Sequence, residues 1–509
     1  MDNGIGSWIT YHTEHTADKI ALIDKEEVFT YESFNTRINQ LANGLWQLGV
    51  RKGDRVSVLL FNRHELLEAL FACAKMGAIF VPINYRLSVE EVEYITKDAG
   101  ARVMIYEERT TPVINGLKGR VKDITHYVYV GEEPDVEDIT YEHMLEQSSS
   151  MEPGLECEND AIHMMMYTSG TTGKPKGAML THGNTQWNAI NILQALSLDK
   201  EDTTLTPAPL FHIGGMNVLT TPMFYLGGTV ILQDVFQPSK TLSLIQAHQV
   251  TCMFLVPAMW MAIMHAPDIE EYDITSLQLN ISGGAPCPLT VIEFFQQRHV
   301  PFYEGFGLTE TAPFVAILDK ENAYRKNGSV GKNPMHTAVR IVDELDREVG
   351  IKEVGELCVK GPNIFAGYWN MPIETRQVMK EGWFHTGDLA MKDEEGFMYI
   401  VDRKKDMIIS GGENIYPIEV EQVLFTHPNV QEAAIVGVPD EKWGEVPKAF
   451  LVLKQKDQAV TREALQTFCA QKLANYKIPK HIEFLNALPR NATGKILKTQ
   501  LRKAQPVKK

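Results

Sequence analysis

Short apolar runs alternate with helix-like segments along most of this chain of 509 residues, and that alternation constrains the fold most strongly. Residues 55–60 have the pattern of a buried strand, residues 64–76 that of a helix, and residues 78–81 that of another strand. This order is typical of α/β domains, in which helices connect neighbouring strands. We therefore predict an α/β fold. Further strands are expected at residues 102–106, 229–232, 251–256 and 277–282, and further helices at residues 238–248 and 289–298.

The pattern changes twice toward the C-terminus. Residues 338–342, 355–359 and 397–401 form a β-rich region punctuated by glycine and proline. From residue 403 onward there are 18 Lys and Arg against 11 Asp and Glu, which leaves a net charge of −23 on the rest of the chain. Because the length exceeds one compact core, we predict a large domain over residues 1–402 and a small α+β domain over residues 403–509. In the small domain, helices are expected at residues 417–425 and 462–473 and strands at residues 430–437 and 448–453.

Composition argues against several classes of protein. No run reaches the roughly 18 apolar residues of a membrane-spanning helix, and the N-terminal residues lack the pattern of a signal peptide. The six cysteines include no C-x-x-C pair, so neither a disulfide framework nor a zinc site is expected. Basic runs with interleaved aromatic residues are absent, so nucleic acid is not an expected partner. A cytoplasmic enzyme fits these features.

Residues 167–177 contain four Ser and Thr hydroxyls, three glycines and two lysines directly after an apolar run. Glycines allow the backbone to approach a ligand closely, and N–H groups, hydroxyls and ammonium groups together suit a polyphosphate. The common phosphate loop would need Ser or Thr after its lysine, whereas Pro175 follows Lys174 and Gly177 follows Lys176. We therefore expect a nucleotide triphosphate site of another kind, with the candidates Thr168, Ser169, Gly170, Thr171, Thr172 and Lys176.

Four further motifs follow this loop, and together the five carry a family resemblance. They read YEGFGLTE at residues 303–310, GWFHTGD at 382–388, DRKKDMIISGGEN at 402–414 and PRNATGK at 489–495. In this order they resemble the adenylate-forming superfamily, which includes acyl-CoA synthetases, peptide-synthetase adenylation domains and beetle luciferases. The likeness spans nearly the whole chain and is greatest to bacterial medium- and long-chain fatty-acyl-CoA ligases of about this length.

The resemblance implies an ATP site and assigns residues to it. The loop would hold the β- and γ-phosphates, Glu310 would bind Mg²⁺ together with phosphate oxygens, and Thr309 would contact the α-phosphate. Phe306 would stack on the adenine, and Asp388 with Arg403 would bind the ribose hydroxyls. The remaining expected nucleotide contacts are Gly283, Gly284, Ala285, Glu304 and Gly305.

The resemblance also implies a catalytic lysine and a moving C-terminal domain. Lys495 would bridge the attacking carboxylate and the α-phosphate, where negative charge grows in the transition state. The domain would rotate at Lys405, withdraw Lys495, and bring Gly411 and Gly412 to the pantetheine arm of CoA. His212 would gate the tunnel for that arm.

The implied reaction is a two-step ligation of a carboxylic acid to CoA through an acyl-adenylate. Acetyl-specific relatives carry Trp where this chain has Gly307, so we interpret that glycine, with Gly214, Gly215 and Gly305, as leaving an open pocket for a medium- or long-chain fatty acid. An aromatic acid resembling cinnamate or benzoate is the alternative. Two other functions are left open, a stand-alone adenylating enzyme that loads a carrier protein and a nucleotide-binding regulator. A homodimer and loose contact with a membrane surface are also left open.

Overall fold

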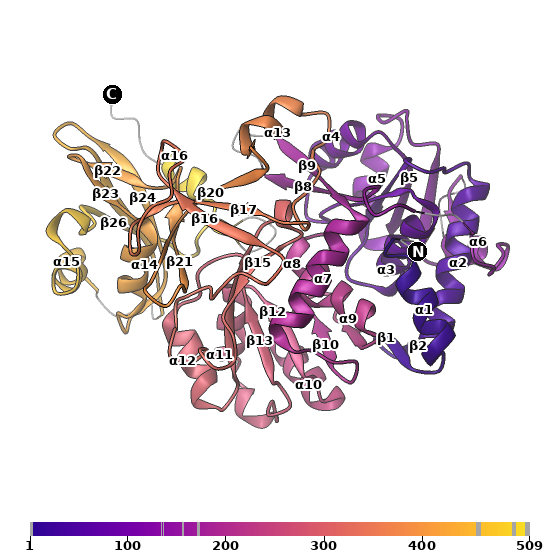
Figure 1. The fold of residues 1–509 in the computed structure, drawn as a ribbon, viewed down its shortest axis with the longest axis horizontal. Helices are drawn as coiled ribbons and strands as arrows, with labels where there is room; N and C mark the ends of the chain where they lie inside the picture. The colour runs from indigo at the N-terminus through magenta and orange to yellow at the C-terminus, as the bar shows by residue number, and fades with distance from the viewer. Residues whose placement is uncertain are drawn as a thin grey trace.

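The computed structural model describes residues 4–133, 135, 137–154, 157–169, 174–454, 460–490 and 495–503, and over these residues the chain forms four β-sheets (Figure 1). Two large sheets lie side by side, and the C-terminal sheet lies at the opposite end of the molecule from the N-terminus. The α/β prediction with a β-rich part and a small C-terminal domain is confirmed. The boundary at residues 402 and 403 and the hinge at Lys405 stay predictions.

The first large sheet has a mainly parallel core. Its two edge pairings, β14 with β15 and β1 with β2, are antiparallel, and the pairings between them are parallel. Parallel strands end at a common edge, where ligands of α/β proteins usually bind. In spatial order the strands are β15 (Phe314–Ile317), β14 (Phe302–Gly307), β13 (Leu279–Ser282), β12 (Cys252–Leu255), β10 (Thr203–Thr206), β11 (Thr229–Leu232), β1 (Ile20–Asp24) and β2 (Glu27–Thr30).

The second large sheet carries the strand that enters the phosphate loop. Its strands β8 and β9 are antiparallel, with Thr168 opposite Lys176, and β9 pairs in turn with the short strand β18. The remaining pairings are parallel. The spatial order is β18 (Gly367–Tyr368), β9 (Pro175–Thr181), β8 (Ile162–Ser169), β4 (Ile79–Pro82), β3 (Arg55–Leu59), β5 (Ala101–Glu107), β6 (His126–Val130) and β7 (Ile139–Thr140).

The two smaller sheets are mostly antiparallel. The third holds Asp388 and Arg403 opposite each other on β20 and β21. It consists of β16 (Ala338–Val342), β17 (Gly355–Lys360), β20 (Trp383–Lys392), β19 (Met379–Lys380) and β21 (Met398–Arg403). The fourth consists of β23 (Glu413–Ile415), β22 (Ile408–Ser410), β25 (Gly444–Leu453), β24 (Val430–Asp440) and β26 (His481–Phe484), the last of which joins β25 in parallel.

The helices pack on both faces of the large sheets. One core lies between the two sheets and includes side chains of both, and further cores cover their outer faces. The helices of the large sheets are α1 (Ser7–Thr16), α2 (Tyr31–Gln47), α3 (His64–Met76), α4 (Val89–Ala99), α5 (Thr111–Leu117), α6 (Tyr141–Glu146), α7 (His182–Leu196), α8 (Ile213–Gly215), α9 (Thr221–Leu226), α10 (Pro238–His248), α11 (Pro257–Met264) and α12 (Leu289–Gln297). Toward the C-terminus follow α13 (Pro372–Val378), α14 (Pro417–Phe425), α15 (Arg462–Ala470) and α16 (Lys498–Lys503). Among the described residues, no helix combines the length and apolar character needed to cross a lipid bilayer.

Local sequence explains where several of these helices begin. The hydroxyl groups of Thr30, Ser88 and Thr181 each accept a hydrogen bond from the backbone N–H three residues later. The side chain at that later position in turn accepts a hydrogen bond from the backbone N–H of the capping residue. Such reciprocal caps satisfy two N–H groups that a helix start leaves unpaired. The last of these caps places α7 directly after β9.

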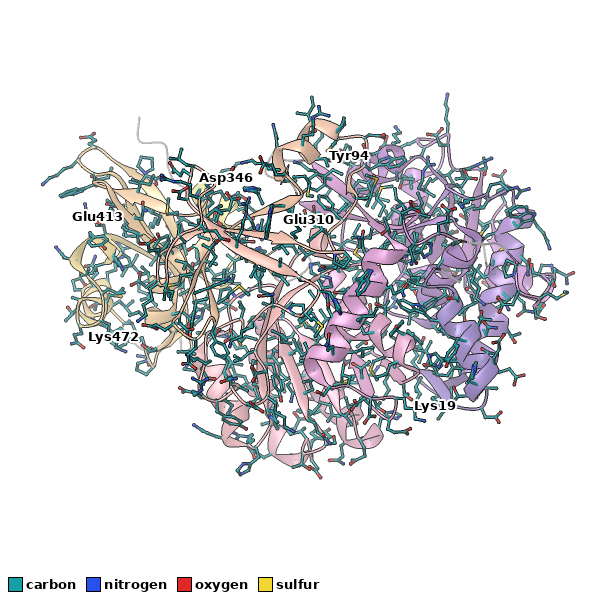
Figure 2. The ribbon with its side chains drawn as sticks, in the orientation of Figure 1. Lys19, Tyr94, Glu310, Asp346, Glu413 and Lys472 are labelled. Carbon is teal, nitrogen blue, oxygen red and sulfur yellow. The ribbon has the colours of Figure 1, made fainter. Side chains whose placement is uncertain are left out.

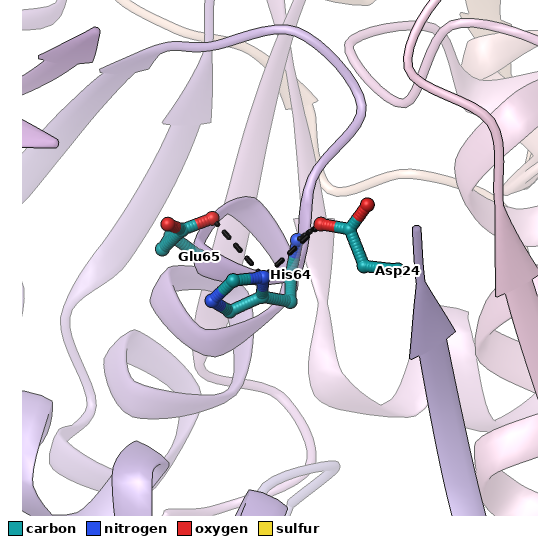
Figure 3. Close-up of side chains that lie close together, drawn as sticks. All are labelled: Asp24, His64 and Glu65. Atoms are coloured by element: carbon teal, nitrogen blue, oxygen red, sulfur yellow. Dashed lines mark hydrogen bonds and ion pairs between the residues drawn. The ribbon is translucent and has the colours of Figure 1, made fainter. Parts of the chain in front are cut away.

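A buried ion network joins β1 to the start of α3 (Figure 3). Asp24 Oδ2 accepts hydrogen bonds from the backbone N–H and from Nδ1 of His64, each at 3.0 Å. Glu65 lies 3.4 Å from the same Nδ1, but Arg63 binds both of its oxygens at 2.6 Å. Three side chains that could ligate a metal therefore meet here, and each already has a hydrogen-bond partner within the protein. Although burial opposes the charged form, Asp24, Glu65 and Glu68 raise the pKa of His64.

We expect Asp24→Asn and His64→Gln each to lower the free energy of unfolding by about 3 kcal/mol, because removing one partner leaves the other charge buried and unpaired. The double variant should lose little more than either single variant. Because the folded pKa of His64 is raised, its contribution is complete below the unfolded value of about 6.5 and is lost as pH rises through the folded value. Urea denaturation of the wild-type protein, the two single variants and the double variant measures the coupling free energy between the two side chains. This coupling free energy should be larger at pH 6 than at pH 9. Additive effects at both values would show that the two side chains do not act as a pair.

Candidate active site

The predicted ribose-binding residues face each other in the third sheet. Arg403 Nε lies 3.3 Å from Asp388 Oδ1, and Asp388 is 4 % exposed. The other oxygen, Oδ2, accepts no hydrogen bond from the described residues. Buried polar atoms are normally paired, so this carboxylate suits a ligand that brings hydroxyl donors, as a ribose does. Burial raises the pKa of Asp388, and Arg403 and Lys495 oppose that rise.

Lys495 reaches this same pair from the C-terminal part of the chain. Burial and the neighbouring charge of Arg403 lower its pKa to about 8, whereas Asp388 acts in the opposite direction. Its charge also acts on His212. The structure therefore brings together Lys495, His212, Asp388 and Arg403, which the sequence separates by up to 283 residues. The role of Lys495 in adenylation stays a prediction.

We expect the rate of adenylation to fall as pH rises above about 8, because only the ammonium form of Lys495 stabilises phosphate charge. The measurement is kcat/KM for pyrophosphate release between pH 6.5 and 9.5, since this parameter reports ionisation in the free enzyme. In Lys495→Arg the alkaline decline should disappear at whatever activity remains, because a guanidinium keeps its charge throughout this range. An identical decline in that variant would assign it to another group.

Glu310, the expected Mg²⁺ ligand, lies near the middle of the molecule (Figure 2). Its Oε1 accepts a hydrogen bond from the hydroxyl of Tyr368 at 2.7 Å, and its backbone carbonyl accepts one from Phe365 at 2.9 Å. Burial raises the pKa of Glu310, and the Tyr368 hydroxyl opposes that rise. One partly buried carboxylate beside a phosphate site fits Mg²⁺, which takes few protein ligands when phosphate oxygens supply the others. Thr309 is buried immediately before it.

The predicted adenine contacts lie where β13 and β14 end. Gly283, Gly284 and Ala285 follow β13, and Gly284 has φ of +81°, a value that favours glycine. Gly305 and Phe306 lie on β14, where Phe306 is partly buried. The carboxylate of Glu304 accepts hydrogen bonds from the N–H groups of Cys287 and Gly328, at 3.3 and 2.9 Å. The side chain of Glu304 therefore secures two loops, and its backbone carbonyl accepts a hydrogen bond from Leu318 at 3.0 Å. Its contact with a nucleotide stays a prediction.

Only the two ends of the phosphate loop can be placed. Gly170, Thr171 and Thr172 lie outside the described residues, as does the side chain of Ser169. Thr168 ends β8 opposite Lys176 on β9. The ammonium group of Lys176 lies 5.1 Å from the centre of the Tyr368 ring. The β8–β9 hairpin therefore directs this lysine toward the same tyrosine that contacts Glu310.

His212 precedes α8 and is neutral at physiological pH. Its Nδ1 accepts a hydrogen bond from the backbone N–H of Gly214 at 3.1 Å, which assigns the ring proton to Nε2. Burial and the charge of Lys495 lower its pKa to about 4. Two glycines near His212 pack on the ring of Phe254. A Cβ added to Gly214 would lie 2.8 Å from that ring, and a Cβ added to Gly283 would lie 3.2 Å from it.

Backbone packing explains why residue 307 is a glycine, and the sequence alone did not reveal this reason. A Cβ at this position would lie 1.8 Å from the backbone oxygen of Pro313, because β14 and β15 approach each other closely there. A Cβ on Gly215 would likewise lie 2.3 Å from the oxygen of Pro209. Backbone packing therefore requires these glycines whatever the size of the acid pocket. The interpretation of Gly307 as an opening for a fatty chain stays a prediction.

The loop predicted to meet CoA belongs to the fourth sheet. Gly411 and Gly412 form the exposed turn between β22 and β23, and both have positive φ. A Cβ on Gly411 would lie 2.6 Å from the ring of Trp443, which is 41 % exposed. Lys405 is exposed, and the charges of Arg403, Asp406 and Arg502 act on it.

Two residues of this region were not predicted from the sequence, Tyr368 and Phe254. Tyr368 contacts Glu310 and Lys176, and Phe254 lies between the segments around His212 and Gly283. Tyr368 belongs to a two-residue strand and Phe254 to an ordinary buried strand, so neither carries a local signal.

Comparison with known proteins agrees with these motifs. The family described as AMP-binding enzyme matches residues 9–369, and the AMP-binding enzyme C-terminal domain matches residues 419–495. A feruloyl-CoA synthase of Amycolatopsis is 40 % identical over 99 % of both chains. The long-chain-fatty-acid–CoA ligase FadD13 of Mycobacterium tuberculosis is 39 % identical over 93 % of this chain and 92 % of its own. The crystal structure of the anthranilate CoA ligase AuaEII with anthranoyl-AMP superposes with a TM-score of 0.93 at 30 % identity, covering 98 % of this chain and 97 % of the other. The chain therefore belongs to the family of AMP-binding enzymes and is a ligase of the acyl-CoA synthetase type.

Proposed function

We propose that this enzyme joins an aromatic carboxylic acid to CoA in two steps at the site formed by Glu310, Asp388, Arg403 and Lys495. In the first step a carboxylate oxygen attacks the α-phosphorus of ATP, the bond to the β-phosphate breaks, and pyrophosphate leaves. In the second step the sulfur of CoA attacks the acyl carbon, the carbon–oxygen bond to AMP breaks, and the thiol proton is released. The products are an aryl-CoA thioester and AMP.

The first step depends on position and charge. Asp388 and Arg403 would hold the ribose, and the ammonium of Lys495 would lie between the attacking carboxylate and the α-phosphate. A preorganised charge in a water-poor site stabilises the developing negative charge strongly. Bound Mg²⁺, held by Glu310 and phosphate oxygens, would supply further positive charge to the departing pyrophosphate.

The second step requires CoA to approach the acyl carbon. The turn at Gly411 and Gly412 would come to the site by rotation of the C-terminal domain about Lys405. Exposed Trp443 next to this turn has Lys442 and Lys480 above its ring, at 4.7 and 5.4 Å. An aromatic ring with two cations suits a nucleotide portion that carries adenine and phosphates. His212 would border the path of the pantetheine arm.

The relatives that act on aromatic acids support the choice of acid, and the packed interior behind Phe254 agrees with it. The cavity there, bounded also by Leu205 and Leu219, has a volume of about 10 Å³, which is room for one water molecule. A long alkyl chain could not continue in that direction, whereas a flat ring could lie against Phe254 on the side of the glycine backbone. The feruloyl-CoA synthase and the anthranilate CoA ligase support the aromatic choice. The fatty-acid prediction is not confirmed, and FadD13 keeps it as the second candidate.

The test is a panel of acids in an ATP- and CoA-dependent assay of AMP release. Ferulate, coumarate, benzoate, anthranilate and indoleacetate are compared with octanoate, laurate and palmitate, each by kcat/KM. We expect at least one aromatic acid to exceed every fatty acid by about 100-fold, and Phe254→Ala to narrow that ratio by admitting longer chains. A palmitate or laurate preference in the wild-type enzyme would contradict the proposal and favour the second candidate.

The acceptor is tested separately. The same adenylating mixture is supplied with CoA or with the phosphopantetheinyl carrier domain of an aryl-specific peptide synthetase. Thioester formation on CoA and not on the carrier is the expected result. Transfer to the carrier alone would favour the stand-alone adenylating enzyme.

A further inference from the structure

Tyr368 lies between the two ends of the expected MgATP site. Its hydroxyl donates a hydrogen bond to Oε1 of Glu310 at 2.7 Å, and the ammonium of Lys176 lies 5.1 Å from the centre of its ring. The carboxylate is the expected metal ligand and the lysine belongs to the expected phosphate loop. A single side chain therefore contacts both groups, and the two contacts use different parts of it.

The surrounding structure holds Tyr368 firmly in this position. Its ring is 9 % exposed and packs edge-to-face on Phe365 with ring centres 4.9 Å apart. Its backbone N–H donates to the hydroxyl of Thr375 at 2.9 Å, and β18 pairs with β9, the strand that leaves the phosphate loop. Phe365 in turn donates its N–H to the backbone oxygen of Glu310. The distance between Glu310 and the phosphate loop is thus set through this segment.

The hydroxyl is a permanent donor to the carboxylate. An ionised carboxylate can only accept hydrogen bonds, so the Tyr368 hydroxyl is the donor in this pair. A hydrogen bond to one oxygen fixes the plane of the carboxylate and leaves the other oxygen to bind a cation. The ring meanwhile attracts the ammonium of Lys176 through its π face, so the lysine remains beside the ring.

We propose that Tyr368 is a positioning residue for MgATP, which orients the carboxylate of Glu310 for the metal through its hydroxyl and holds Lys176 for the phosphates through its ring. The proposal rests on the ATP and Mg²⁺ roles in the proposed function and is independent of the acid that is activated. It predicts two separable defects, one in metal dependence and one in nucleotide affinity.

Tyr368→Phe removes the hydroxyl and keeps the ring. We expect the Mg²⁺ concentration for half-maximal enhancement of ATP binding to rise about tenfold, because a hydrogen bond to a charged group is lost. ATP affinity without Mg²⁺ should stay within twofold of the wild-type value. Tyr368→Leu removes the ring as well, and we expect it to weaken ATP binding without Mg²⁺ by about threefold, because the contact with Lys176 is lost.

Tyr94 provides a matched control. Its ring lies 5.3 Å from the ammonium of Lys174, the other lysine of the loop, but its hydroxyl donates to the backbone oxygen of Pro175 and not to a carboxylate. Figure 2 shows Tyr94 and Glu310 apart from each other in the fold. Tyr94→Phe should therefore leave the Mg²⁺ dependence of ATP binding unchanged.

Isothermal titration calorimetry with ATP and no acid, over a series of Mg²⁺ concentrations, measures both defects, and thermal melting checks that each variant is folded. Wild-type Mg²⁺ dependence in Tyr368→Phe would overturn the proposal, as would an equal shift in Tyr94→Phe. A loss of ATP affinity that is the same with and without Mg²⁺ would indicate a purely structural role and would also overturn it. If the wild-type protein bound ATP without any Mg²⁺ dependence, the metal role in the proposed function would fail as well.

Discussion

Replacing Lys495 with alanine is expected to slow formation of the acyl-adenylate by about 10²–10³-fold, the usual loss when one preorganised charge is removed from a developing anion. The ammonium is partly buried beside Asp388 and Arg403, so water cannot replace it fully. ATP binding should change far less, because the ribose and pyrophosphate ends are held by other residues. The measurement is acid-dependent pyrophosphate release in the absence of CoA.

Two comparisons separate this role from a general effect. Lys503→Ala removes an exposed lysine of the nearby helix α16 and should leave the rate unchanged. Chemically synthesised aroyl-AMP should react with CoA at nearly the wild-type rate in Lys495→Ala, because the second step does not need this lysine. Equal losses in both half-reactions would contradict the assignment of Lys495 to adenylation.

Replacing Gly307 with alanine is expected to lower the free energy of unfolding by about 3 kcal/mol, near the upper end for an overpacked site. The new Cβ would lie 1.8 Å from the backbone oxygen of Pro313, and backbone on both sides must move to relieve that contact. Thr309 and Glu310 follow directly, so adenylation should fall together with stability. Thermal melting and pyrophosphate release measure the two effects.

Gly305 is the matched control on the same strand. A Cβ there would approach no atom closer than 3.5 Å, so Gly305→Ala should fold with nearly wild-type stability. If Gly307→Ala were equally stable and merely favoured smaller acids, Gly307 would control pocket size as the sequence comparison suggested. Loss of stability at Gly307 alone would show that backbone packing requires the glycine.

Most regular elements could be predicted because their signals are local. The helix at residues 64–76 and the strand at residues 229–232 agree with α3 and β11 at both ends. Motifs likewise predicted that Lys495, Asp388 and Arg403 act together, and the structure brings these side chains close to one another. Their roles in catalysis stay predictions until the variants are measured.

The remainder depends on contacts between distant parts of the chain. Tyr368 acquires its meaning only when β18 pairs with β9 and places its hydroxyl against Glu310, 58 residues earlier. Gly307 requires knowledge of the β14–β15 approach, and the pairing of Asp24 with His64 requires β1 to lie beside the start of α3. No periodicity or motif in one segment reports such contacts. The identity of the acid likewise cannot be predicted from one segment, because several segments form its pocket.

The proposed reaction is adenylation of an aromatic carboxylate followed by transfer of the acyl group to CoA. Its most direct test is mass spectrometry of the enzyme incubated with MgATP and the best aromatic acid of the panel, first without CoA and then with it. We expect an aroyl-AMP species with release of pyrophosphate, followed on addition of CoA by its conversion to aroyl-CoA and AMP. Absence of any aroyl-AMP, or formation of ADP and phosphate in place of AMP and pyrophosphate, would contradict it.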